Sequence, residues 1–128
     1  MRKLEHKERF FDRIDDAIAD IRREGYHLHL FCHNEEDKIG LHRHPIDQTL
    51  YLLRGKLVFF VEGQRERYEL LRGARFVLPR CVMHAVSADA GTEYLMGWSK
   101  DISWKQFDDE SECKKETVKL PKTRSQGR

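Results

Sequence analysis

Three histidines and one glutamine occur at spacings that would let them bind a single metal ion. His42 and His44 lie two positions apart, Gln48 follows four residues later, and His84 stands in a separate segment. Side chains two residues apart in a strand point to the same face, and Gln48 keeps this parity if the register survives the turn at Pro45. Imidazole suits zinc, copper, iron and nickel, and an amide oxygen is a weaker, neutral ligand. The pattern predicts a metal site on a β-scaffold.

The two segments that carry these residues resemble the two sequence motifs of the cupin superfamily. Residues 42–55 are similar to the first motif (His-x-His, three residues, Glu, six residues, Gly), and residues 79–84 are similar to the second (Pro-x-Gly-x-x-His). The resemblance covers about residues 26–99. It implies a small antiparallel β-barrel of the cupin (jelly-roll) type that binds one divalent ion, iron, nickel, manganese or zinc, through His42, His44, Gln48 and His84.

The chain departs from the motifs at positions that bear on chemistry. Gln48 replaces the usual glutamate, Cys81 replaces the glycine of the second motif, and Ala88 stands where an asparagine is often found. Without the carboxylate a bound ion keeps its full charge and favours anionic ligands. Glycine at a turn often supplies a positive φ, so Cys81 must form a different turn or bear some strain.

The remaining elements follow from periodicity. Apolar residues recur at helical spacing between Glu5 and Glu24, and Gly25 provides a stop. We expect strands over residues 26–33, 49–53, 57–61, 68–71, 76–78, 85–87 and 94–98, with the first motif in a strand of its own. Short strands with glycine-marked turns are typical of an all-β barrel or sandwich. Tyr94, Met96 and Trp98 share one face and are candidates to line its cavity.

The chain divides into an N-terminal amphipathic helix (1–25), a barrel (26–101) and a charged C-terminal extension (102–128) that we expect to be partly disordered and flexible. The helix is expected to cover the barrel or a second subunit. Arg75 and Arg80 could meet a substrate carboxylate, but exposure to solvent is the simpler expectation. His27 and His29 are expected to be a surface or stacking pair rather than ligands.

Composition limits the partners. The net charge is +2, with basic and acidic residues interspersed, so neither nucleic acid nor an anionic membrane is expected as a partner. Three cysteines, Cys32, Cys81 and Cys113, cannot all pair within one chain, which favours a reducing compartment, and Cys113 is expected to be incidental. We expect a cytoplasmic homodimer that binds a small molecule.

Three functions fit such a centre. A divalent ion with about two open positions could act as a Lewis acid, and the three-histidine, one-glutamine set resembles cupins that tautomerise unsaturated sugar acids. An Fe(II) dioxygenase is the first alternative. A sensor or effector module that binds without turnover is the second. The neutral ligand set favours Lewis-acid chemistry, and the sequence assigns no residue that moves a proton.

Overall fold

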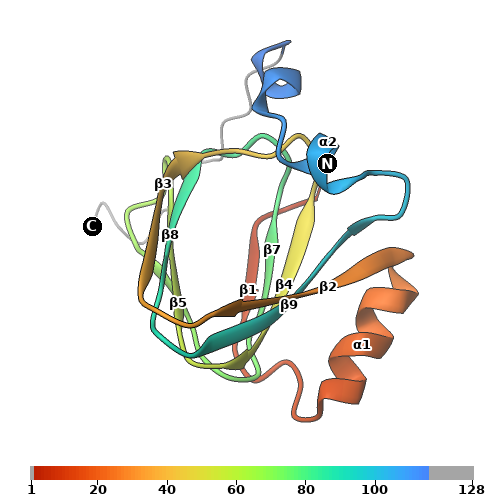
Figure 1. The fold of residues 1–128 in the computed structure, drawn as a ribbon, viewed down its shortest axis with the longest axis vertical. Coiled ribbons are helices and arrows are strands. Elements are labelled where there is room, and N and C mark those ends of the chain that lie inside the picture. Colours follow the sequence, from red (N-terminus) through yellow and green to blue (C-terminus); the bar gives the residue numbers. More distant parts are fainter. Residues whose placement is uncertain (1, 116–128) are drawn as a thin grey trace.

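Two antiparallel sheets face each other and form a jelly-roll barrel (Figure 1). The structure is a computed structural model that describes residues 2–115. The five-stranded sheet has the order β1 (Glu5–Lys7), β7 (Arg75–Leu78), β4 (Gln48–Arg54), β9 (Thr92–Ser99) and β2 (Tyr26–His33). The four-stranded sheet has the order β3 (Asp37–His42), β8 (His84–Ala88), β5 (Leu57–Val61) and β6 (Tyr68–Leu70). The all-β prediction is confirmed.

The strands begin and end close to the predicted residues because their side chains alternate between the two faces of a sheet. In β4, Leu50 and Leu52 point into the barrel, and Tyr51 between them points to the outer face. The inner side chains form the main core. It comprises Leu50, Leu52, Leu57, Phe59, Val61, Leu70, Ala74, Phe76, Leu78, Val82, Ala88, Tyr94, Met96, Trp98 and Phe107.

Helix α1 (Ile14–Arg23) lies outside the barrel against the five-stranded sheet (Figure 1). Ala17 and Ile21 are fully buried and form a second core with Tyr51 and Leu95 on the outer face of that sheet. Acidic residues in its first turn and basic residues in its last turn complement the helix dipole. The apolar stripe of α1 is therefore used by its own barrel, which was one of the two arrangements expected.

The helix is shorter than the periodicity predicts. Residues Glu5–Lys7 form strand β1, which pairs with β7, and the backbone amides of Phe10 and Phe11 donate to the carbonyl of Gly73. Both phenylalanines fit a helical repeat, but here they lie in a non-helical connection between β1 and α1. Within residues 2–115, no helix has the length and apolar character required to cross a bilayer.

Arg75 is buried, contrary to the expectation that it faces solvent. Its guanidinium contacts Asp20 at 2.9 Å, Glu5 at 2.6 Å and Glu24 at 3.3 Å, and the residue is only 6% exposed. Asp20 also accepts a short hydrogen bond from the Tyr51 hydroxyl. This ionic cluster lies between α1 and the outer face of the sheet, so Arg75 has no access to a ligand inside the barrel.

The C-terminal extension is structured as far as residue 115. Helix α2 (Trp104–Phe107) begins at a capping box formed by Ser103 and Gln106, and a 3₁₀ turn covers Glu110–Lys115. Cys113 is fully buried and forms a disulfide with Cys81, so the expectation that it is incidental is wrong. The disorder expected further along the chain falls on residues 116–128, which lie outside the described residues.

Candidate metal centre

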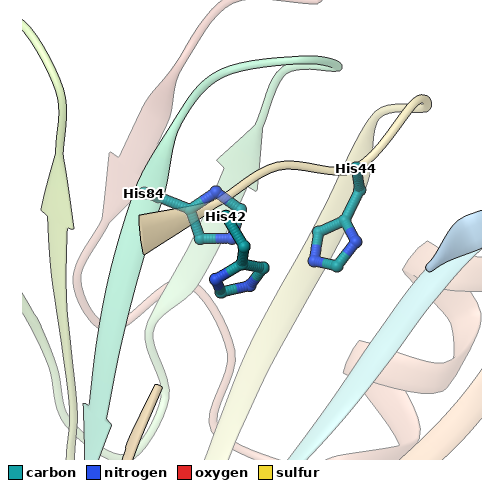
Figure 2. A group of neighbouring side chains, drawn as sticks. All are labelled: His42, His44 and His84. Carbon is teal, nitrogen blue, oxygen red and sulfur yellow. The ribbon is translucent and has the colours of Figure 1, made fainter. Parts of the chain in front are cut away.

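His42, His44 and His84 converge at one end of the barrel (Figure 2). His84 is the first residue of β8, His42 is the last of β3, and His44 lies on the loop that follows. One ring nitrogen from each histidine lies within 4.8 Å of the other two. The ring centroids of His42 and His84 are 4.3 Å apart, and those of His42 and His44 are 4.9 Å apart. The cluster could hold a metal ion.

Backbone carbonyl groups orient all three rings in the same way. The Nδ1 atoms of His42, His44 and His84 lie 2.6, 3.0 and 2.9 Å from the carbonyl oxygens of Gly40, Phe107 and Val82. A carbonyl oxygen can only accept, so each Nδ1 carries the proton and each Nε2 is left with a free lone pair. Hydrogen bonds of this kind orient the histidine ligands of metal sites.

Two of the three histidines, His44 and His84, are held in the neutral form that a metal ion requires. Burial is the main reason that the pKa of His44 falls to about 4, and the nearby ring of His42 lowers it further. Burial is also the main cause that lowers the pKa of His84 to about 3. Both imidazoles therefore keep their lone pairs well below neutral pH, and protons compete weakly with a cation for them.

Gln48, the predicted amide ligand, lies against the same cavity. It is the first residue of β4 and is only 3% exposed. Its Oε1 atom is buried and has no hydrogen-bond partner among the described residues. An unpaired buried amide oxygen costs free energy, and a cation in the cavity would remove that cost. The donor set of three Nε2 atoms and one amide oxygen fits a divalent metal ion.

The cavity beside the histidines has a volume of about 420 Å³. Tyr94 and Met96 line it, as expected of the inner face of β9. Trp98 does not, because its ring stacks between those of His29 and Phe107, at 3.8 and 4.1 Å. Most of the remaining wall is apolar, and the charged side chains that contribute to it are Arg43, Asp108 and Glu110.

His27 and His29 take no part in the cluster. Their ring centroids are 6.2 Å apart on β2, His27 is exposed, and His29 is the residue that stacks on Trp98. The expectation that this His-x-His pair is not a ligand pair therefore agrees with its position.

The C-terminal extension supplies one side of the site, which the sequence did not reveal. The Phe107 ring stacks on His44 with the ring centroids 4.1 Å apart, and the Phe107 carbonyl is the partner of His44 Nδ1. Glu110 accepts a hydrogen bond from the backbone amide of Arg43, and Trp104 lines the cavity. The Cys81–Cys113 disulfide fastens this segment to the turn that precedes His84.

Cys81 occupies the glycine position of the second motif with φ of +59°, so it adopts the left-handed conformation that glycine would take there. Its backbone amide donates to the carbonyl oxygen of His44 at 2.6 Å. This turn thus joins the two motifs directly, next to the clustered histidines.

No protein-family model and no curated protein matches the chain. Solved structures are similar to it. A cupin-2 domain protein from Shewanella frigidimarina has a TM-score of 0.50 and 19% identity, and the match covers 59% of this chain and 72% of that one. A candidate mannose-6-phosphate isomerase from Ralstonia eutropha has a TM-score of 0.52 and 18% identity, with 60% and 77% covered.

A third similar structure is the TDP-quinovose 3,4-ketoisomerase WlaRB of Campylobacter jejuni. Its TM-score is 0.55 and its identity 13%, and the match covers 70% of this chain and 75% of that one. Similarity at these identities is a similarity of fold. The chain therefore has the fold of the cupin superfamily, as its two motifs predict.

Proposed function

We propose that this protein is a metal-dependent isomerase or tautomerase that shifts a proton on a small, anionic carbonyl compound of the sugar-acid type. One observation carries the proposal. Three imidazoles have their Nδ1 atoms fixed by backbone carbonyls and their Nε2 atoms free, and a buried amide oxygen without a partner lines the same cavity.

The ligand set decides which chemistry is favoured. An ion held by His42, His44, Gln48 and His84 would act as a Lewis acid that polarises a carbonyl or enol oxygen. All four donors are neutral, so the full charge of a divalent ion would attract an anion. The residues of the chain add orientation through the carbonyls of Gly40, Phe107 and Val82, and most of the cavity wall is apolar.

Two of the structural neighbours have names that denote the isomerisation of a sugar derivative, namely the Campylobacter ketoisomerase and the Ralstonia protein. Their likeness to this chain is one of fold. It supports the proposal only in that barrels of this architecture include proteins named for the same class of reaction.

A second candidate function is oxygen chemistry at Fe(II), which the apolar walls favour. Phe31, Leu50, Phe59, Val86 and Met96 surround the cavity, and such a lining would accommodate an uncharged ligand beside dioxygen. Binding without turnover is the third candidate and would use the same pocket.

Elemental analysis of the protein, purified without an affinity tag or added metal, tests the proposal first. We expect one equivalent of nickel, manganese or zinc in the wild type and none in a His42→Ala/His84→Ala double variant. His27→Ala is the matched control, because it removes a histidine that lies outside the cluster. Iron together with consumption of dioxygen would favour the second candidate. No bound metal after reconstitution would refute both enzymatic functions.

A further inference from the structure

Asp37, His33 and Tyr94 form a row of polar contacts that begins at one wall of the cavity and ends outside it. The Nε2 atom of His33 lies 3.1 Å from the Tyr94 hydroxyl, and its Nδ1 atom lies 3.3 Å from a carboxylate oxygen of Asp37. His33 ends β2 and Tyr94 lies on the neighbouring β9. Both side chains line the cavity that contains the three clustered histidines.

The chemistry of the three groups favours one direction of proton donation. A carboxylate oxygen carries only lone pairs, so at the 3.3 Å contact with Asp37 the favoured tautomer of His33 is the one with its ring proton on Nδ1. The Nε2 atom is then left with a lone pair, and the Tyr94 hydroxyl donates to it. This carboxylate–imidazole–hydroxyl order is the arrangement in which an imidazole can take a proton from a hydroxyl group.

Burial changes steadily along the chain of groups. Tyr94 is 6% exposed, the His33 side chain is 14% exposed, and the Asp37 side chain is 50% exposed. The buried end of the row, Tyr94, is a residue of the cavity wall, whereas the carboxylate of Asp37 reaches solvent. Stacking against Phe31, with parallel rings 5.4 Å apart, holds the Tyr94 ring in place.

We propose that Tyr94 is the catalytic acid and base of this pocket, and that His33 and Asp37 are the positioning residues that take up and return its proton. The inference rests on the proposed proton shift. As the substrate C–H bond breaks, the Tyr94 oxygen receives that proton while its own proton passes to His33 Nε2. The electron pair of the C–H bond enters the enolate, and the Asp37 carboxylate stabilises the imidazolium. In the enediolate of a hydroxycarbonyl substrate, the reverse transfers deliver a proton to the neighbouring carbon, while the proton of the substrate hydroxyl moves to the enediolate oxygen, so the carbonyl and hydroxyl groups exchange places.

The environment of Tyr94 explains why a relay is needed. Burial, assisted by the negative charge of Asp37, raises the pKa of Tyr94 to about 12. The hydroxyl is therefore protonated at rest and would be a poor base by itself. With His33 as acceptor, the phenol can receive one proton and release another in the same event, so no free phenolate has to accumulate.

The first test is structural and needs no substrate. Nitrogen-15 NMR of the full chain should show His33 with its proton on Nδ1, and Asp37→Asn should raise the fraction with the proton on Nε2. A wild-type His33 that carries its proton on Nε2 would overturn the proposal, because such a ring donates to Tyr94 and cannot accept its proton.

The second test follows exchange of the carbon-bound hydrogens of hydroxypyruvate in D₂O, with metal-free protein as background. Hydroxypyruvate combines a carboxylate, a ketone and a hydroxyl group. We expect the Tyr94→Phe variant to keep its metal and to have an exchange rate at least about 100-fold lower than that of the wild type. Tyr68→Phe is the matched control, because the Tyr68 hydroxyl bonds Gln64 away from the cavity and its loss should change nothing.

The outcomes separate the relay from the function on which it rests. If the metal-loaded wild type catalyses exchange and Tyr94→Phe catalyses it at the same rate, the relay alone is overturned. No exchange by the loaded wild type would overturn the proposed proton shift and, with it, the catalytic role of Tyr94. If Tyr94→Phe does not retain metal, the exchange rate of Asp37→Asn decides between the outcomes. Because the Asp37 carboxylate is half-exposed, we expect its replacement to lower the exchange rate on the order of 10-fold. An unchanged exchange rate would refute the relay.

Discussion

Removal of the Cys81–Cys113 disulfide should destabilise the protein by a predictable amount. The two cysteines are 32 residues apart, and the chain-entropy relation for a loop of this length gives about 3.7 kcal/mol at 25 °C. Measured values commonly fall below this limit, so we expect Cys113→Ala to lower the free energy of unfolding by about 2 to 4 kcal/mol. The assay is urea unfolding of the oxidised wild type and the variant, each with and without a dithiol reductant.

The reductant provides an internal check on the cause. It should lower the unfolding midpoint of the wild type and leave that of Cys113→Ala unchanged. Cys32→Ala is the matched control, because Cys32 is a free, exposed cysteine and its removal should leave both midpoints at wild-type values. Thiol titration of the denatured, oxidised protein should find one free thiol of the three cysteines. Three free thiols, or a wild type that is insensitive to the reductant, would refute the reasoning.

Three further predictions concern pH, the ionic cluster and assembly. Unfolded imidazoles take up protons near pH 6.5, whereas the buried rings of His44 and His84 resist protonation until about pH 4 and 3. Lowering the pH from 7.5 to 5 should therefore cost the metal-free protein about 2 kcal/mol of stability for each histidine, or about 4 kcal/mol for the two; unfolding that does not depend on pH would contradict this. Asp20→Ala leaves Arg75 buried with fewer partners and should lower the free energy of unfolding by about 3 kcal/mol, measured by thermal or urea unfolding. Asp16→Ala, at an exposed position of the same helix, is the control and should leave this free energy nearly unchanged. The expected homodimer stays a prediction, which light scattering would test: a monomeric mass at micromolar concentration would rule it out.

The barrel and the histidine cluster were predictable because their signals are local. Alternation located β2 and a short apolar run between turns located β5, both at the observed bounds, and the two motifs brought together His42, His44 and His84. The sequence could not show how far the helix extends. The same apolar spacing is compatible with a helix and with the irregular segment around Phe10, and only the contacts with β7 and Gly73 distinguish the two.

The parts that were missed depend on contacts between distant residues. A charged segment predicted a loose extension, yet Phe107 is buried against His44 and Trp98. The approach of His33 to Tyr94 follows from the pairing of β2 with β9, for which the sequence contains no local pattern. Arg75 looked like a surface residue because its three carboxylate partners lie 51 to 70 residues earlier in the chain.

The carbonyl that orients His44 belongs to Phe107, 63 residues later in the chain. During synthesis on the ribosome, His42, His44 and His84 all emerge before Phe107, so a nascent barrel can gather its imidazoles while one of them still lacks its partner. The oriented set of ligands forms only when the later segment docks. A shortened translation product that stops before Phe107 would thus carry the three histidines without the group that orients one of them.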